Sequence, residues 1–362
     1  LSSSSAASDV YKRQIFKRGD YMLILAKATM ALMLGFVLSL ITGLFVIPAF
    51  KKLHFGQTVS RYIPKRHLKK EGTPTMGGVI FIIPVIISLI ILYFKGSIEI
   101  SYNLITVVFV FLAYALLGFI DDYMKIKFHD NNGISLVTKF LIQMVIALVF
   151  FYLFMKGGGE PTLSLSFLNI YIPLGWLFGI FILFLLVGTT NAVNITDGLD
   201  GLAGGLCAIA FFAYGIITWN AGWLEGYQEV AIFCFLLTGS LIGFLVFNTH
   251  PARIFMGDLG SLALGGALAA VAVVSRHELS LVLIGGVFVI ETLSSLIQII
   301  SIRQFNKKVF LKAPLHHHFE ELGWSENDII KMFWVVGFIF AMAAIVYGVW
   351  SVSYTHLRAH ET

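Results

Sequence analysis

The stretch EVAIFCFLLTGSLIGFLVF, residues 229–247, contains a single charged residue, Glu229, at its start. An α-helix needs about 20 largely apolar residues to cross the hydrocarbon core of a bilayer, so this stretch is typical of a transmembrane helix. With nine similar stretches it predicts ten spans, at 22–48, 76–94, 103–120, 136–155, 172–188, 201–219, 229–247, 260–275, 280–302 and 329–350. Because backbone groups in lipid must be paired internally, these spans predict an all-α polytopic membrane protein, a bundle of about ten transmembrane helices.

The composition of the whole chain supports this fold class. Of its 362 residues 58% are hydrophobic and 12% charged, whereas soluble domains average about 45–50% and about 25%. The mean hydropathy is +0.87. The two cysteines, Cys207 and Cys234, lie inside apolar runs and indicate neither a disulfide framework nor a metal site. The spans at 172–188 and 260–275 are short and contain glycine, which leaves room for tilted or broken helices there.

The chain shows no internal repeat and no second, soluble domain. We therefore expect one integral-membrane domain over residues 21–350. The ends, residues 1–20 and 351–362, look like appended adaptor-derived or disordered sequence rather than part of the fold.

The distribution of Lys and Arg predicts the orientation in the membrane. The loops at 49–75, 121–139, 189–200, 248–259 and 303–328 together carry fifteen basic residues, whereas the loops at 95–102, 156–171, 220–228 and 276–279 carry three. Cytoplasmic loops are the ones enriched in Lys and Arg. The first set is therefore predicted to be cytoplasmic, with both termini outside.

The unusual polar clusters all fall in, or directly beside, the predicted cytoplasmic loops. They are KKEGTPTMGG (69–78), GFIDDYMKIK (118–127), NAVNITDGLDGLAGG (191–205), FNTHPARIFMGDLGS (247–261) and APLHHHFEELGW (313–324). A transporter would more naturally place polar groups near the midplane of the bilayer. A rim on one side favours an active site at the cytoplasmic face.

The carboxylates of these clusters suit a hard cation. Asp121 and Asp122 are adjacent, so on a helix their side chains diverge by about 100° and two separate roles are expected. Asp197 and Asp200 are spaced to share a helical face, and Asp258 follows a loop-like Phe-Met-Gly. With Asn191, Asn194 and Asn248 they form an oxygen-rich group of the kind that binds Mg²⁺. The alternative, that such residues only cap helices, is strongest for Asp200.

The basic residues of the rim are less specific. Three consecutive imidazoles, His316, His317 and His318, cannot all bind one zinc ion. They either contact phosphate or orient a catalytic group, or they simply lie in an exposed polar loop. Lys70 and Lys139 precede apolar helices, where they could meet phosphates or lipid head groups. Their alternative is snorkelling to the membrane surface.

Six segments, in order, resemble the family of phospho-N-acetylmuramoyl-pentapeptide transferases. They are HLKKEGTPTMGG, GFIDDYMK, TKF, NAVNITDGLDGLAGG, FNTHPARIFMGDLGSLALG and APLHHHFEELGW, and the resemblance runs from about Ile47 to Trp350. It implies ten transmembrane helices and a cytoplasmic active site, in agreement with the spans and loops counted above. Only the two ends fall outside the pattern.

The resemblance also implies a reaction and its partners. Undecaprenyl phosphate would attack the β-phosphate of UDP-N-acetylmuramoyl-pentapeptide, releasing UMP and leaving lipid I in the bilayer for bacterial cell wall synthesis. Mg²⁺ is the implied cofactor, a homodimer is an expectation at the level of the family, and no nucleic-acid partner is expected. The implied location is the bacterial inner membrane.

Carried over motif by motif, the resemblance implies roles for single residues. Asp258 would hold Mg²⁺, and Asp121, supported by Asp122, would be the base or nucleophile near the lipid phosphate. Asp197 would lie near the metal or pyrophosphate, and Asp200, Asn248, Lys70 and the ring of Phe255 would recognise uridine. Lys139, Thr75 and Asn194 would complete the polar floor, while His316, taken as catalytic, with His317 and His318 would contact the phosphates or the sugar.

Two other functions stay open at this point. A UDP-N-acetylglucosamine:polyprenyl-phosphate transferase shares the aspartates, although GTPTMGG and PLHHHFE weigh against it. A proton-coupled transporter would need ionisable residues in mid-span, and only Lys27 and Glu291 suggest any.

Overall fold

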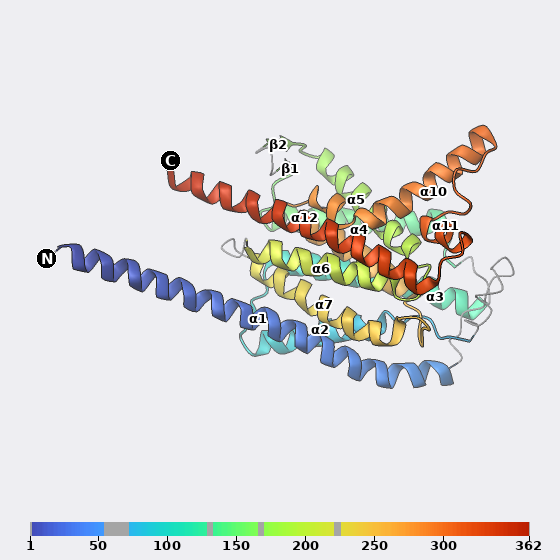
Figure 1. The fold of residues 1–362 in the computed structure, drawn as a ribbon, viewed down its shortest axis with the longest axis horizontal. Coiled ribbons are helices and arrows are strands. Elements are labelled where there is room, and N and C mark those ends of the chain that lie inside the picture. Colours follow the sequence, from blue (N-terminus) through green and yellow to red (C-terminus); the bar gives the residue numbers. More distant parts are fainter. Residues whose placement is uncertain (1, 54–71, 129–132, 166–169, 221–225, 362) are drawn as a thin grey trace.

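The computed structural model describes residues 2–53, 72–128, 133–165, 170–220 and 226–361. Its elements are α1 (Ser2–Lys52), α2 (Val79–Phe94), α3 (Tyr102–Phe128), α4 (Leu136–Lys156), β1 (Thr162–Leu165), β2 (Ile170–Pro173), α5 (Leu177–Thr196), α6 (Leu202–Asn220), α7 (Tyr227–Asn248), α8 (Gly257–Val274), α9 (Ser280–Ile284), α10 (Gly286–Phe305), α11 (Leu315–Glu321) and α12 (Glu326–Glu361). The long helices run roughly side by side as a bundle (Figure 1).

The prediction of an all-α membrane protein is confirmed. Nine helices in the described residues are long and apolar enough to cross a membrane, and α2 is a shorter apolar helix between two of them. The two cysteines are buried and unpaired. Helices α1 and α12 continue into residues 2–20 and 351–361, but the apolar portions able to span begin at Ala26 and end at Gly348. The assignment of the two ends as appended sequence stays a prediction.

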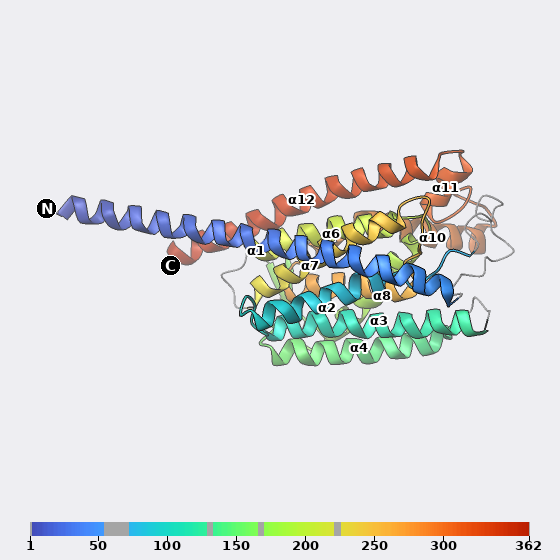
Figure 2. The same ribbon diagram turned by 90° about the horizontal axis from the view of Figure 1, so that it is seen from below.

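Helices α7 and α8 form the centre of the bundle. In their most apolar windows, 83% of α7 and 89% of α8 is buried, against 28% for α1 and 22% for α4. Helix α8 packs against α3 and α5, and α7 packs against α1 and α6. In Figure 2, α3 and α4 lie side by side along one edge of the bundle. The small residues of α8, which is rich in glycine and alanine, permit this close approach of helices.

One glycine brings α3 and α8 into register at the site. A Cβ at Gly118 of α3 would overlap the backbone carbonyl of Asp258 at the start of α8. The missing side chain lets the two backbones touch there. This contact places Asp121 and Asp122, one turn further along α3, next to Asp258.

Four sequence expectations about the elements are wrong in detail. The region 189–200, predicted as a loop, is helical as far as Thr196, and Asp258 lies in the first turn of α8 rather than in a loop. The histidine triplet, also predicted to lie in a loop, forms the short helix α11. The broken span is 280–302, where α9 ends and α10 begins around Gly285, and not 172–188 or 260–275.

The two ends of the bundle differ in structure. An antiparallel β1–β2 hairpin, with Thr162 opposite Pro173 and Leu165 opposite Ile170, lies at one end. The C-terminal ends of α3, α5, α7 and α10 and the helix α11 lie at the other (Figure 1). The start of α8 lies there too, against the end of α3. The polar clusters of the described residues therefore gather at one end of the bundle, as the alternation of loops predicts.

Candidate active site

Three carboxylates from two helices meet at this polar end. Oxygens of Asp121, Asp122 and Asp258 lie within 4.8 Å of one another, an arrangement able to hold a metal ion. Asp121 and Asp122 are buried, and the side chain of Asp258 is 14% exposed. We call these three residues the aspartate cluster. Carboxylate oxygens are the donors that hard divalent cations prefer, so the donor set fits a metal ion such as Mg²⁺.

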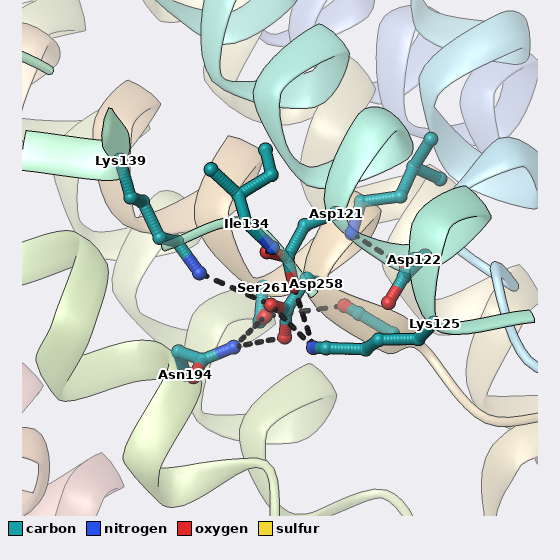
Figure 3. Close-up of polar contacts among 10 residues, drawn as sticks. Asp121, Asp122, Lys125, Ile134, Lys139, Asn194, Asp258 and Ser261 are labelled. Atoms are coloured by element: carbon teal, nitrogen blue, oxygen red, sulfur yellow. Dashed lines mark hydrogen bonds and ion pairs between the residues drawn. The ribbon is translucent and has the colours of Figure 1, made fainter. Parts of the chain in front are cut away.

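Two lysines lie against the aspartate cluster, as Figure 3 shows. Lys125 Nζ lies 2.6 Å from Asp121 Oδ2 and 2.9 Å from Asp258 Oδ2, and Lys139 Nζ lies 3.1 Å from the same Asp258 oxygen. The lysines come from α3 and α4 and are themselves only partly buried. The cluster thus presents both signs of charge at its accessible edge, which suits a ligand made of phosphate and metal.

One oxygen of each carboxylate also accepts a hydrogen bond from an N–H group. The amide Nδ2 of Asn194 donates to Asp258 Oδ1 at 2.7 Å and to Ser261 Oγ at 2.8 Å. The backbone N–H of Ile134 donates to Asp121 Oδ1, and that of Leu259 donates to Asp122 Oδ2. Asp121 and Asp122 therefore have different partners, and their two separate roles stay a prediction.

Thr75 and Phe255 come from two loops that pair beside the cluster. The backbone N–H of Phe255 donates to the carbonyl of Pro74, and that of Gly77 donates to the carbonyl of Phe255, both at 2.8 Å. Thr75 is buried, and its hydroxyl and the carboxylate of Asp122 both border Gly257, where an added Cβ would overlap them. The ring of Phe255 is half-buried. Lys70 lies outside the described residues.

The other two predicted acids do not join the aspartate cluster, contrary to the single constellation of five expected from the sequence. Asp200 Oδ2 lies 3.1 Å from His250 Nδ1, which is also 3.2 Å from Glu326 Oε2. The backbone N–H of Asp200 donates to Glu326 Oε1. This second group ties the chain after α5 to the start of α12. Asp197 ends α5 and is half-buried.

Asn248 closes the loop between α7 and α8. Its Nδ2 donates to the carbonyl of Ile254 at 2.9 Å, and the side chain is buried. It thereby shapes the segment that ends in Phe255 and Asp258. That Asn248 binds uridine stays a prediction.

The three histidines of α11 have three different environments. His316 is 1% exposed, and its Nδ1 lies 2.9 Å from Oε2 of Glu291. His317 Nδ1 contacts Glu320 Oε2 at 2.6 Å, and burial lowers the pKa of His317 although Glu320 opposes the shift. His318 Nδ1 accepts from the backbone N–H of Leu311. None of the three belongs to the aspartate cluster.

Sequence reasoning missed several residues of the site. Lys125 stands four residues after Asp121 on a helix, the spacing at which opposite charges meet, so this one had a local signal. Ser261, His250 and Glu326 had none, because they are brought in from distant segments. Glu291, which had suggested a transporter, is instead the partner of His316.

Comparisons with known proteins point to a transferase. Residues 104–276 match Glycosyl transferase family 4. Together with the bundle and the aspartate cluster, the match defines the class: an integral-membrane transferase with its polar site at one end of the helices.

More specific matches narrow the class to one family. Residues 70–82 match signature 1 of the phospho-N-acetylmuramoyl-pentapeptide-transferases. The enzyme of that name from Geobacillus thermodenitrificans is 46% identical over 320 residues, 88% of this chain and 97% of the relative. Its counterpart from Bacillus subtilis is 44% identical over 319 residues, with the same coverage. The chain therefore belongs to the family of phospho-N-acetylmuramoyl-pentapeptide transferases.

Proposed function

We propose that this protein transfers phospho-N-acetylmuramoyl-pentapeptide from its UDP carrier to undecaprenyl phosphate, which yields lipid I and UMP. The observation that carries the proposal is the 46% identity over 97% of a relative named for this transfer. The aspartate cluster supports it, since phosphoryl transfer depends on positioning and charge neutralisation more than on covalent machinery.

The bond changes of the proposed reaction are simple. An oxygen of the lipid phosphate attacks the β-phosphorus of the nucleotide sugar, and the bond from that phosphorus to the bridging oxygen breaks. The bridging oxygen leaves as part of UMP, and a new lipid-linked diphosphate remains in the membrane. If the lipid phosphate arrives protonated, its proton passes to a nearby carboxylate, and Asp121 is the proposed base.

The residues of the cluster would share the work of binding the diphosphate. We assign Asp258 as the metal ligand, with Asp122 supporting Asp121. Mg²⁺, when bound, would neutralise charge that develops on the diphosphate. Lys139 and Asn194 orient Asp258. The side chain of Lys139 is 16% exposed, so its ammonium group can contact a phosphate oxygen.

The residues around the cluster would bind the rest of the nucleotide sugar. We assign Asp197 to the pyrophosphate side and Asp200, Asn248, Lys70 and Phe255 to uridine, with the Phe255 ring stacking on the base. Thr75 completes the polar floor. His317 and His318 are assigned to the phosphates or the sugar, and His316 to the reaction site through the arrangement described below.

The proposal includes a location. The polar end of the bundle would face the cytoplasm, where the nucleotide is supplied, with both termini on the outside of the bacterial inner membrane. The excess of Lys and Arg in the loops at this end supports the orientation. We also propose a homodimer, for which membership of the family is the support.

The deciding experiment measures UMP release by the purified protein with undecaprenyl phosphate and Mg²⁺. UDP-N-acetylmuramoyl-pentapeptide should release UMP, and UDP-N-acetylglucosamine should release almost none, because a site built for specific hydrogen bonds can reject analogues by a factor of about 10⁴. Activity with the second nucleotide alone would make the protein a different sugar-phosphate transferase. Release from neither, by folded protein, would overturn the proposal.

A further inference from the structure

We infer that Glu291 is the positioning residue of His316 and, through it, of the loop DGLDG at residues 197–201. The inference rests on the proposed transfer, because that loop carries Asp197 and Asp200. Glu291 lies in α10 and His316 in α11, so the pair joins two helices that are separated in the chain by residues 306–314.

Both carboxylate oxygens of Glu291 contact the same residue, His316. Its Oε1 accepts the backbone N–H of His316 at 3.1 Å, and its Oε2 lies 2.9 Å from His316 Nδ1. The two side chains are 0% and 1% exposed. A buried carboxylate is costly unless it is hydrogen-bonded, and here both of its partners belong to the histidine. The carboxylate therefore fixes the ring and the backbone of His316 together.

This contact also determines which ring nitrogen carries hydrogen. A carboxylate only accepts hydrogen bonds, so Nδ1 of His316 is the donor. When the ring carries a single hydrogen, that hydrogen is on Nδ1 and Nε2 has a lone pair. Nε2 is buried and has no hydrogen-bond partner in the described part of the chain.

Nε2 points at the DGLDG loop. A Cβ at Gly198 would overlap Nε2 and crowd the neighbouring ring carbon. The loop thus accepts the imidazole edge only because residue 198 is glycine. Its other end is held by the contacts of Asp200 with His250 and Glu326. A ring rotated away from Glu291 would lose its contact with Gly198, the residue next to Asp197.

The first test is the protonation form of the ring. In ¹⁵N-histidine spectra of the purified full chain, the signal absent from His316→Asn should have hydrogen on Nδ1. In Glu291→Gln, the amide offers only one acceptor to the two N–H groups of His316, and the backbone cannot give up its hydrogen. The signal should therefore change to the form with hydrogen on Nε2. A wild-type ring with hydrogen on Nε2 alone would overturn the inference.

The second test is kinetic and uses UMP release. Glu291→Gln should lower kcat/KM for the nucleotide substrate by at least about tenfold, as loss of the acid that orients a functional histidine does. The KM for the nucleotide should rise while that for undecaprenyl phosphate stays unchanged. The same exchange at Glu160, which pairs with Arg276 at the far end of the bundle, should leave both constants as in wild type.

A double variant separates a positioning role from mere stabilisation. Glu291→Gln added to His316→Asn should lower activity by no more than about twofold beyond His316→Asn alone, since a residue acting through another has nothing left to contribute. Independent, multiplying losses would overturn the inference.

If Glu291→Gln does not fold, Gly198→Ala tests the contact between His316 and the DGLDG loop. This variant should raise the KM for the nucleotide while the spectrum of His316 keeps hydrogen on Nδ1. An unchanged KM would count against the inference. Absence of UMP release from wild type would refute the proposed function, whereas the spectra would still test the pair.

Discussion

Lys125 of α3 bridges Asp121 of its own helix and Asp258 of α8, with N–O distances of 2.6 and 2.9 Å. The contact to Asp258 joins residues 133 positions apart. One ammonium group therefore balances two carboxylates that would otherwise repel each other. Because a divalent cation would serve the same purpose, Lys125 and a bound metal ion are expected to support the cluster in partly interchangeable ways.

Replacing Lys125 by Met should expose this relationship. Without the ammonium, the carboxylates of Asp121 and Asp258 repel, so the midpoint of thermal unfolding in detergent should fall when divalent cations are removed. Added Mg²⁺ should restore most of the loss, because it supplies the missing positive charge. Lys127→Met, two residues along the same helix and outside the cluster, is the control. A midpoint insensitive to Mg²⁺ in Lys125→Met would contradict the argument.

Asp258→Asn tests the assignment of the metal ligand. The amide keeps the shape of the side chain but removes its charge, so the protein should fold while UMP release falls by several orders of magnitude. Thermal unfolding of the variant and of wild type, with and without Mg²⁺, provides the check on folding and metal binding. Near-normal turnover of the variant, or full wild-type activity in excess chelator, would show that Asp258 holds no essential ion.

The fold was predictable because membrane spans depend on local composition. Runs such as 229–247 are apolar over the thickness of a bilayer, whatever they pack against. The errors lie where helices continue into polar sequence: Asn191 and Asn194 lie within α5, since a helix can extend beyond the lipid into a polar end. The break at Gly285 was missed because the run is apolar on both sides of it, although the pair Gly285–Gly286 marks the position.

The sequence predicted which acidic residues belong to the site better than how they are grouped within it. Asp121, Asp122 and Asp258 gathered as expected, because their helix ends lie on one side of the bundle. The separation of Asp200 from that cluster depends on His250 and Glu326, which come from other segments and carry no local signal. Such partners are determined by how the helices pack, and a single sequence shows no local pattern from which that packing can be predicted.

An exchange experiment distinguishes direct attack from a covalent intermediate on Asp121. If Asp121 took up the phospho-sugar, enzyme with nucleotide substrate and no lipid should incorporate labelled UMP into that substrate. We expect no such exchange, because a positioned base, two lysines and a metal ion suffice for direct attack. Delipidated wild-type protein and Asp121→Asn should both be measured. Robust exchange in the former and none in the latter would establish the covalent route.

Glu278 should make the stability of the protein depend on pH. It lies between α8 and α9, 1% exposed, with no hydrogen-bond partner for either oxygen among the described residues. Burial raises its pKa from 4.5 to about 8. Between these values the folded protein keeps a proton that the unfolded chain releases, so stability should fall as pH rises through that window. Glu278→Gln should flatten the dependence of the unfolding midpoint between pH 5 and 8, whereas Glu160→Gln should retain it; equal slopes would refute the assignment.

Cysteine accessibility tests which end of the bundle faces the cytoplasm. In a background with alanine at Cys207 and Cys234, both buried, single cysteines would replace Glu321 at the polar end and Glu160 at the hairpin end. Both positions are exposed, and neither is assigned to the site. If the basic loops are cytoplasmic, a membrane-impermeant thiol reagent should label residue 160 in cells with a permeable outer barrier and intact inner membrane, and residue 321 only in inside-out vesicles. Labelling of both after detergent solubilisation is the control for reactivity. The reverse pattern would place the aspartate cluster outside the cell, where the nucleotide substrate is not supplied, and would contradict the proposed orientation and function together.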